Sequence, residues 1–344
     1  MESGPPSGTS LRARRRASGL TQGELASRAG VSRQLIAAVE GGQNVPSVDA
    51  ALRLARALAT TVEALFAPAP PRVLPAVTED LREGRPLRVG RVGDRLVAAE
   101  LADHGAAGAA WARPDGRIEA GELVLFENAA PAGFVLAGCD PALGIAEAML
   151  AGLGERSVLA LPASTGPALQ ALGSGRIHAA VVHGPGEALP EASVPVLRLH
   201  LARWRVGIAH PPELAFNDLA GLLESGLAVV QREPAASSQQ ALERALRRGG
   251  HERSPAGPAA AGHLEAARTA AILGCAALTT ESAARAFGLR FMPLEEHTVQ
   301  VWVADRWTAQ PAFAAFGDVI SSAAFTSRVR QFGGYELADC GSRV

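Results

Sequence analysis

The segment at residues 21–42, TQGELASRAGVSRQLIAAVEGG, constrains the fold of this chain more than any other stretch. Thr21 and Glu24 have the spacing of a capping box, in which each side chain satisfies a free N–H at the start of a helix. Gly30 then ends that helix, because glycine adopts the left-handed conformation without steric cost. Ser32 caps a second helix. The pattern predicts two short helices joined by a tight turn, an arrangement that places the second helix in the major groove of DNA.

One helix before this segment and two after it complete an all-helical domain over residues 11–66. The domain resembles the XRE family of phage-repressor-like helix-turn-helix regulators, and the match rests on the pattern TQxELAxxxGVSRQxIxxxExG. The resemblance implies a DNA-binding domain in which Gln22 contacts a phosphate. It also implies that Ser32, Arg33 and Gln34 open the recognition helix, where side chains reach the edges of the bases.

The side chains of the recognition helix predict that the protein contacts only a few bases directly. Arg33 suits guanine and Gln34 suits adenine, because each can form two hydrogen bonds to one base edge. Ala37 and Ala38 stand where related proteins often carry longer side chains, which limits the base contacts. A helical bundle used for protein contacts is the alternative to DNA binding. The candidate contacts to the DNA backbone, which position a protein without specifying sequence, are Arg14, Arg15, Arg16 and Asn44. A solvated charge run is the alternative for the three arginines.

Composition limits the partners and the compartment. The chain has 344 residues, enough for two or three domains, and is 48% hydrophobic, so it can bury a core. Its formal net charge is -1, so any basic surface for nucleic acid must be local, as the arginines within residues 12–16 are. Cys139, Cys275 and Cys340 are far apart and form no CxxC pair. Their spacing favours reduced thiols in a cytoplasmic protein.

Neither a targeting segment nor a membrane span is expected. Residues 1–10, MESGPPSGTS, are polar and predict a disordered tail rather than a signal peptide. No apolar run approaches the roughly 20 residues that a membrane-spanning helix needs. The expected localisation is cytoplasmic, with no membrane partner.

Residues 67–132 are expected to form a proline-rich linker followed by a small β unit. The linker APAPPRVLP cannot continue a helix. The stretch RPLRVGRVGDRLVAAEL predicts a strand, a Gly-Asp turn and a second strand. AGAAWARPDG then ends in a Pro-Asp-Gly turn before the expected strand GELVLFEN. A spacer or a dimer contact is the expected role of this unit.

Residues 133–344 alternate expected strands with expected helices. Such alternation predicts an α/β domain that is built on parallel sheets with helices on both faces. LRFMPLEEHTVQVWVA is expected to form a strand pair or a crossover. FAAFGDVISSAAFTSRVRQFGG is expected to form one closing helix at the end of the domain.

Five stretches of this domain, taken in order, resemble the periplasmic-binding-protein-like domains that follow helix-turn-helix units in bacterial regulators. They are AGCDPALGI, STGPALQALGSGRIHAAVVHG, RWRVGIAHP, VVQREPAASSQQALERAL and HLEAARTAAILGCAALTTESAARAFGLRFMPLEE. The transport relatives nearest to this family are type II solute-binding proteins of the molybdate class. The resemblance implies two α/β lobes around a ligand cleft. The expected fold class is therefore multidomain, with an all-α helix-turn-helix domain, a small β unit and a two-lobed α/β domain.

Candidate ligand residues lie where expected strands end and helices begin. In open α/β sheets ligands bind at the carboxyl ends of the strands, and the free N–H groups at helix N-termini favour anions. Arg203 and Arg232 would add charge and paired hydrogen bonds. Ordinary helix capping is the alternative role for the serines. The candidates at these positions are Asp140, Ser164, Thr165, Gly166, Ser237 and Ser238.

Asp140 argues against a bare dianion as the ligand, because a carboxylate repels it. A pterin-like or sugar-like metabolite with hydrogen-bond donors and an anionic end is the favoured ligand, and molybdate or tungstate is the alternative. Helix capping is the alternative role for Asp140. His183, His263 and Glu281 are further candidates for the cleft, and a satisfied structural histidine is the alternative for His183. Cys139 is expected to be a small buried strand residue.

An enzyme is not expected, because the chain has no GxSxG, HExxH or GxxxxGK[ST] motif. The cysteines and histidines are scattered, so the sequence predicts neither a metal site nor a cofactor. It predicts a bacterial transcriptional regulator that binds double-stranded DNA as a homodimer, because paired half-sites require two heads. A polar or anionic small molecule is the expected effector. A non-sensing assembly scaffold with a DNA-binding head is the alternative.

Overall fold

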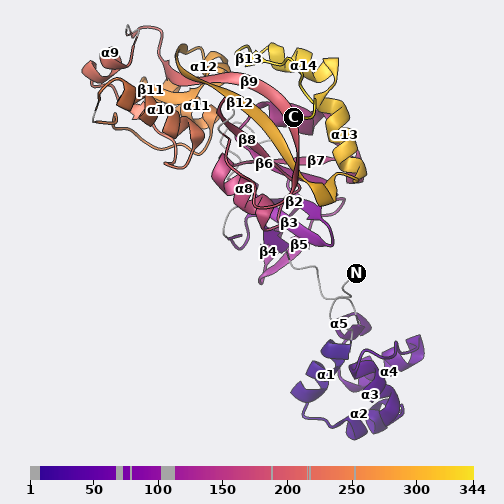
Figure 1. The fold of residues 1–344 in the computed structure, drawn as a ribbon. Coiled ribbons are helices and arrows are strands. Elements are labelled where there is room, and N and C mark those ends of the chain that lie inside the picture. The colour runs from indigo at the N-terminus through magenta and orange to yellow at the C-terminus, as the bar shows by residue number, and fades with distance from the viewer. Residues whose placement is uncertain are drawn as a thin grey trace. The chain divides into compact units, whose positions relative to one another are not determined.

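The structure is a computed structural model, and it forms two compact units, one up to residue 71 and one from residue 72 (Figure 1). Among the helices that the structure describes, none combines the length and the apolar character that crossing a membrane requires. Of the expected tail, residues 1–7 lie outside the described residues, whereas Gly8 already belongs to a helix. The described residues are 8–66, 73–77, 80–101, 113–186, 189–214, 216, 218–251 and 253–344.

The helical unit has the expected helix-turn-helix at its centre. The capping box is present, since the Thr21 side chain accepts from the Glu24 N–H while the Glu24 carboxylate accepts from the Thr21 N–H. Gly30 ends the first motif helix with φ of 63°, and the Ser32 hydroxyl accepts from the Leu35 N–H to cap the second. The helices are α1 (Gly8–Ala17), α2 (Gln22–Ala29), α3 (Arg33–Glu40), α4 (Val48–Ala57) and α5 (Val62–Phe66).

One side chain from each of these helices meets in a shared core. Leu11, Leu25, Ile36, Leu54 and Leu65 are all buried there. Helices of this length are marginal in water by themselves, so the unit depends on this packing rather than on helix propensity.

A buried ion pair joins α1 to the end of α3. Arg15 donates through Nε and Nη2 to the two carboxylate oxygens of Glu40, at 2.6 and 2.9 Å, and through Nη1 to the carbonyl of Leu20. Gln22 donates to the same carboxylate at 3.0 Å. The Glu40 side chain is completely buried. Its charge is therefore compensated by these donors instead of by water.

The second unit begins with a five-stranded sheet in the order β1-β3-β2-β4-β5. This sheet packs against the α/β fold, because Val92, Val97 and Ala99 share one hydrophobic core with Val135 and Ala137 of β6. The sheet is therefore part of the α/β unit rather than a spacer. Residues 67–72 of the expected linker and residues 107–112 of AGAAWARPDG lie outside the described residues. The strands are β1 (Val73–Pro75), β2 (Pro86–Val92), β3 (Arg95–Glu100), β4 (Gly116–Glu119) and β5 (Glu122–Leu125).

Gly90 allows β2 to lie directly on β6. A Cβ atom at this position would lie 2.2 Å from Cγ2 of Val135, which is far inside van der Waals contact. The same close approach lets the Arg91 N–H donate to the carbonyl of Ala132. The glycine in the middle of a strand thus marks the contact between the two sheets.

A second, eight-stranded sheet forms the α/β fold, in the order β10-β11-β9-β12-β8-β6-β7 with β13 also paired to β9. Two long strands, β9 and β12, pair antiparallel along their length and extend through both halves of the sheet (Figure 1). The pairs β6/β7, β6/β8 and β10/β11 are parallel, as expected, whereas β11/β9, β12/β8 and β13/β9 are antiparallel, so the sheet is mixed. The strands are β6 (Phe134–Gly138), β7 (Val158–Pro162), β8 (Ala179–Pro185), β9 (Val196–His210), β10 (Val229–Val230), β11 (Ala276–Thr280), β12 (Arg290–Ala304) and β13 (Tyr335–Glu336).

Helices cover this sheet in two groups, which form the two lobes. The first lobe contains α8, α13 and α14, and the second contains α9 to α12 (Figure 1). Helix α7 belongs to the first lobe, because it contacts α13, α14 and β7. Short 3-10 turns lie at Gly154–Arg156 and Asp305–Trp307. The helices are α7 (Ala142–Met149), α8 (Thr165–Gly173), α9 (Leu219–Glu224), α10 (Ser237–Arg248), α11 (His263–Leu273), α12 (Glu281–Ala286), α13 (Pro311–Ile320) and α14 (Ala323–Arg330).

The structure decides two sequence-based expectations for the end of the chain. Of the strand pair or crossover expected for LRFMPLEEHTVQVWVA, the structure has one continuous strand, β12 from Arg290 on, which bends through register shifts at Pro293/Glu295 and Val299/Gln300 and crosses between the halves of the sheet instead of turning back. The expected single closing helix is two helices, α13 and α14. It breaks at Ser321 because the next residue, Ser322, caps α14 by accepting from a backbone N–H.

We expect Glu40→Ala to destabilise the helical unit by about 3–5 kcal/mol, because it leaves the Arg15 guanidinium buried without its carboxylate partner. Amide hydrogen exchange of α1 to α3 in the full chain measures this loss, with the α/β unit as internal reference. Asp49→Ala is the control, because it removes only the exposed ion pair between Asp49 and Arg53. Equal protection in Glu40→Ala and wild type would show that the pair contributes nothing.

The same carboxylate makes this stability depend on pH. Burial raises the pKa of Glu40, but hydrogen bonds from Arg15 and Gln22 lower it more, so the net pKa lies below the ordinary 4.5. A lowered pKa in the folded state stabilises the unit fully above the ordinary value, and this contribution is lost as pH falls through the folded-state pKa. Protection of α1 and α3 should fall below pH 4.5 in wild type, and this component should be absent in Glu40→Ala.

Candidate functional site

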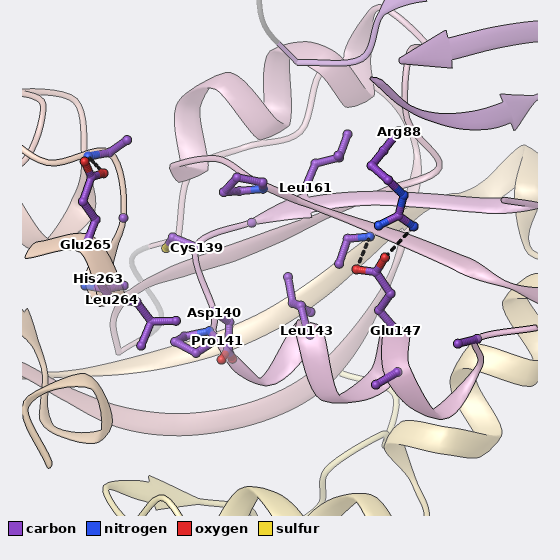
Figure 2. Close-up of a pocket in the computed structure, with 18 of the residues that line it drawn as sticks. Arg88, Cys139, Asp140, Pro141, Leu143, Glu147, Leu161, His263, Leu264 and Glu265 are labelled. Atoms are coloured by element: carbon purple, nitrogen blue, oxygen red, sulfur yellow. Dashed lines mark hydrogen bonds and ion pairs between the residues drawn. The ribbon is translucent and has the colours of Figure 1, made fainter. Parts of the chain in front are cut away.

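A cavity of about 680 Å³ lies beside the carboxyl end of β6, where the sequence predicted a ligand cleft (Figure 2). The loop after β6 and helix α7 form one wall, and the N-terminal end of α11 forms the opposite wall. Strand β2 closes the outer side, where Arg88 donates to Asp115 at 3.3 Å and to Glu147 at 2.8 Å. The cavity is therefore bounded by both lobes and by the β unit.

Asp140 caps helix α7 and keeps one oxygen unused. Its Oδ1 accepts from the Ala142 N–H at 2.8 Å and from the Tyr335 hydroxyl at 2.7 Å. Its Oδ2 is buried and has no hydrogen-bond partner among the described residues. Burial raises the pKa of Asp140 to about 6, although both hydrogen bonds oppose this shift. The carboxylate thus serves as a helix cap and also offers an acceptor to a ligand.

A chain of side chains leads from Glu295 to Cys139. The Glu295 carboxylate lies 3.0 Å from His297 Nε2, His297 Nδ1 lies 2.9 Å from His183 Nδ1, and His183 Nε2 lies 3.2 Å from Cys139 Sγ. The carboxylate requires a proton on His297 Nε2, so His297 Nδ1 accepts and His183 Nδ1 donates. His183 Nε2 is then the unprotonated nitrogen, and it faces the thiol. Arg244 holds Glu295 from the other side at 2.6 Å.

His263 and Arg232 form the second half of the polar cluster. Arg232 donates to the carbonyls of Ala260 and Ala261, and its Nη1 lies 3.2 Å from His263 Nδ1. His263 Nε2 is buried and has no partner in the part of the chain that the structure describes. Burial, with the Arg232 charge, holds the pKa of His263 well below its usual value. Burial does the same to His183 and raises the pKa of Cys139 to about 12. These groups are therefore neutral at pH 7.

Two serine hydroxyls at helix starts are buried without using their hydrogen bonds. Ser164 precedes α8 and Ser238 lies in the first turn of α10, and neither Oγ has a partner among the described residues. Thr165 accepts from the His183 N–H at 3.4 Å. Gly166 has open space where a side chain would be, and Ser237 is only half-buried. Serines that cap helices would use their oxygens. The ligand role of Ser164 and Ser238 stays a prediction, because neither residue lines the cavity.

Two candidates, Arg203 and Glu281, do not line this cavity. Arg203 is exposed because side chains alternate along β9, and the neighbouring Trp204 takes the buried side. Glu281 is buried, but its oxygens accept from Arg205 at 2.6 Å and from Arg285 at 2.7 Å. Its carboxylate is thus already compensated. Burial raises the pKa of Glu281, but the hydrogen bonds and charges of these two arginines lower it by more. Its net pKa therefore lies below the usual value.

The sequence did not predict the aromatic and histidine groups that surround the cluster. In the sheet, Trp204 of β9 pairs directly with His297 of β12, while His183 of β8 pairs with Val299 of β12. These three side chains therefore lie on one face of three neighbouring strands, with ring centroids of His183 at 5.3 Å from Trp204 and 5.1 Å from His297. The alternation of side chains along each strand can be found in the sequence and indicates which residues share a face. The register between the strands, which the sequence does not show, decides that these three side chains lie next to one another.

The recognition helix presents its predicted residues to solvent. Ser32, Arg33, Gln34 and Ala37 are exposed at the start of α3, as is Asn44 after it. Side chains that read base edges have to be accessible in this way. The exposure of these side chains is therefore compatible with the predicted DNA contacts, which stay predictions.

Two helix-turn-helix candidates have other partners. The predicted DNA-backbone role of Arg15 is wrong, because its guanidinium is buried against Glu40 and the Leu20 carbonyl. Gln22 is half-buried and donates to the same carboxylate. A phosphate contact from Gln22 remains a prediction, and it would have to use an N–H that Glu40 leaves free.

Comparison with known proteins assigns both units. Residues 8–67 match the family model of a helix-turn-helix domain, and residues 146–321 match that of a PBP superfamily domain. An uncharacterized HTH-type transcriptional regulator from Methanothermobacter thermautotrophicus is 54% identical over 50 residues, which cover 14% of this chain and 72% of the relative. The chain belongs to the helix-turn-helix transcriptional regulators and carries a PBP superfamily domain. The resemblances to the XRE family and to the periplasmic-binding-protein-like domains are confirmed.

Solved structures with similarity to this regulator include both types of unit. The restriction-modification controller protein C.AhdI from Aeromonas hydrophila is 39% identical and covers 18% of the regulator and 92% of its own chain, with a TM-score of 0.17. An ABC-type phosphate transport receptor from Vibrio cholerae is 11% identical and covers 59% of the regulator and 99% of its own chain, with a TM-score of 0.42.

We expect Tyr335→Phe to destabilise the α/β unit of the regulator by about 1.5–3 kcal/mol, because a buried carboxylate loses a hydrogen-bond donor. Thermal denaturation checks the direction. A double-mutant cycle with Asp140→Asn isolates the pair, and a coupling free energy near zero would show that the hydrogen bond does not hold Asp140 in place.

Proposed function

We propose that this regulator binds operator DNA through α3 and responds to a small polar molecule bound in the cavity between its lobes. Operator DNA as the partner implies action in the cytoplasm, and paired half-sites imply a homodimer. The proposed role of the cavity is recognition rather than catalysis. Ligand and DNA would then change each other's affinity by the same factor, since coupling between two sites is reciprocal.

The observation that carries the ligand proposal is a set of buried polar atoms without partners among the described residues, of which Asp140 Oδ2 and His263 Nε2 belong to residues that line the cavity. Burying such an atom without a hydrogen bond costs about 1–3 kcal/mol, so several together indicate that another molecule supplies the bonds. The atoms come from β6, β9, α8, α10 and α11 or the loops beside them. They are Asp140 Oδ2, Ser164 Oγ, Trp204 Nε1, Ser238 Oγ and His263 Nε2.

Charge indicates what kind of molecule fits. Arg232 is buried, and none of the ion pairs among the described residues includes it. Three of its five N–H groups are used, so two remain for an anionic group. Asp140 supplies the opposite requirement, because its free oxygen accepts from a donor. A polar metabolite with an anionic end and a donor edge satisfies both.

A bare oxyanion such as molybdate is the second candidate. It is favoured by the buried Arg232 and by the two serine hydroxyls, which are suited to an oxyanion. It would leave Asp140 Oδ2 unpaired and close to a like charge. The organic ligand would satisfy both Arg232 and Asp140 Oδ2, so it agrees with more of the polar groups than a bare oxyanion does.

We expect Arg33→Ala and Gln34→Ala each to weaken specific operator binding by about 1–3 kcal/mol, roughly 5- to 150-fold, because each removes a paired contact to one base. An operator selected from random DNA by the purified regulator provides the probe, and fluorescence anisotropy at fixed salt measures the affinity.

Arg56→Ala is the matched control, since Arg56 is an exposed arginine of α4 in the same unit with no predicted base contact. Arg33→Ala should relax the preference at one position of the operator, and Arg56→Ala should leave all positions unchanged. Unaltered specificity in the Arg33→Ala, Gln34→Ala double variant would overturn the assigned recognition helix.

We expect at least one compound of a polar panel to raise the melting temperature of the regulator. A ligand at a hundred times its Kd adds about 2.7 kcal/mol to stability. The panel contains molybdate, tungstate, sulfate, phosphate, pterins, nucleosides, sugars and amino acids. Arg232→Gln should weaken the responding compound about 10- to 150-fold, because a charged hydrogen bond contributes about 1.5–3 kcal/mol. Ser238→Ala should weaken it less.

Arg203→Gln is the matched control, because it removes an arginine from the exposed side of β9. Melting without ligand shows whether each variant is folded. A response to oxyanions only would exclude the organic ligand. A response that survives both Arg232→Gln and Ser238→Ala would place the ligand elsewhere.

A further inference from the structure

Three potential metal ligands from distant parts of the sequence converge beside the cavity, and two of them, Cys139 and His263, line it. They are Cys139 after β6, His183 on β8 and His263 at the start of α11. One ligand atom of each lies within 4.8 Å of the other two. All three are buried or half-buried, and α11 belongs to the second lobe while β6 and β8 belong to the first.

The spacing fits a tetrahedral ion after a small adjustment. Bond lengths of about 2.3 Å to sulfur and 2.0 Å to nitrogen place tetrahedral S and N ligands about 3.5 Å apart. Cys139 Sγ and His183 Nε2 are 3.2 Å apart and would separate slightly. His263 would approach from within 4.8 Å. One thiolate and two imidazoles match the ligand preference of Zn²⁺ and leave a fourth position open toward the cavity.

The groups behind His183 already have the arrangement that a metal-bound histidine needs. Glu295 accepts from His297 Nε2–H, His297 Nδ1 accepts from His183 Nδ1–H, and the lone pair of His183 Nε2 points to Cys139. Metal-bound histidines usually donate their other N–H to a partner that fixes the ring and its tautomer. In this protein a histidine and a carboxylate in series serve as that partner, and Arg244 anchors the carboxylate.

His263 supplies the independent indication of a bound group, because its Nε2 is buried and unpaired among the described residues. Coordination through Nε2 would move its proton to Nδ1. The Arg232 Nη1 contact at 3.2 Å would then be lost, while the two carbonyl contacts of Arg232 could remain. Arg232 thus opposes a cation at this position by its charge and by its donor.

We propose that Cys139, His183 and His263 form a binding site for a zinc-class divalent ion that links the two lobes. Binding forms one bond to sulfur and two to nitrogen, and it releases the thiol proton of Cys139 to solvent without any redox change. The site shares the cavity with the proposed small-molecule ligand but does not depend on that ligand. An ion held by residues of both lobes would stabilise their closed arrangement.

The first test is titration of the full-length, reduced protein with Zn²⁺ against a competing chelator, together with the absorption spectrum of the Co²⁺-loaded protein. We expect one ion per chain and a thiolate-to-cobalt charge-transfer band with tetrahedral d–d bands. Cys139→Ser should remove the charge-transfer band, and Cys340→Ser, which changes a cysteine that donates to the Ile320 carbonyl, should keep it. His297→Gln should weaken Zn²⁺ binding about 10- to 100-fold, as loss of an outer partner does in other metal sites.

Wild-type protein without a charge-transfer band would overturn the proposal, and so would a band that survives Cys139→Ser. The wild-type spectrum needs no variant, so misfolding of a variant cannot obscure the result. Arg232→Gln separates this site from the proposed ligand site. It should bind Zn²⁺ more tightly than wild type while its response to the polar panel falls. Response to the panel without Zn²⁺ binding would refute the metal site alone, and Zn²⁺ binding without any response would refute the ligand alone.

Discussion

The antiparallel pairing of β9 with β12 is the contact on which the α/β unit depends. Both strands extend through the two halves of the eight-stranded sheet, so every helix of either lobe packs on a surface that they help to form. Their register also sets the polar site, because Trp204 lies opposite His297 and His183 lies on the next strand. A slip by one residue would turn these side chains to the other face of the sheet.

The cavity concentrates features that a stable fold would otherwise avoid. Buried hydroxyls, a carboxylate oxygen and an imidazole nitrogen lack partners among the described residues, and a buried arginine has no carboxylate in its ion-pair range there. Elsewhere in the same unit, the buried carboxylates of Glu100 and Glu281 are paired with arginines. A bound molecule or ion can satisfy the groups that line the cavity, whereas His178 Nε2 and Trp307 Nε1, in another part of the core, also lack partners among the described residues.

The helical unit compensates its buried carboxylate with side chains of its own helices. Glu40 is completely buried, yet Arg15 and Gln22 supply its hydrogen bonds from the two preceding helices. The pair fixes the end of the recognition helix while its start, at Ser32 to Gln34, stays exposed. One arginine of the basic N-terminal cluster is therefore structural, whereas neighbouring Arg14 and Arg16 remain exposed.

The sequence by itself determined the helix-turn-helix, the α/β class and the position of Asp140, Ser164 and Ser238 at strand ends and helix starts. These features depend on caps, turns and periodicity within a few residues. Only the tertiary structure decided that Arg203 points away from the cavity, that Arg15 is buried, and that Cys139, His183 and His263 meet. Strand register and lobe packing join residues that are far apart along the chain, and local patterns do not encode those distances.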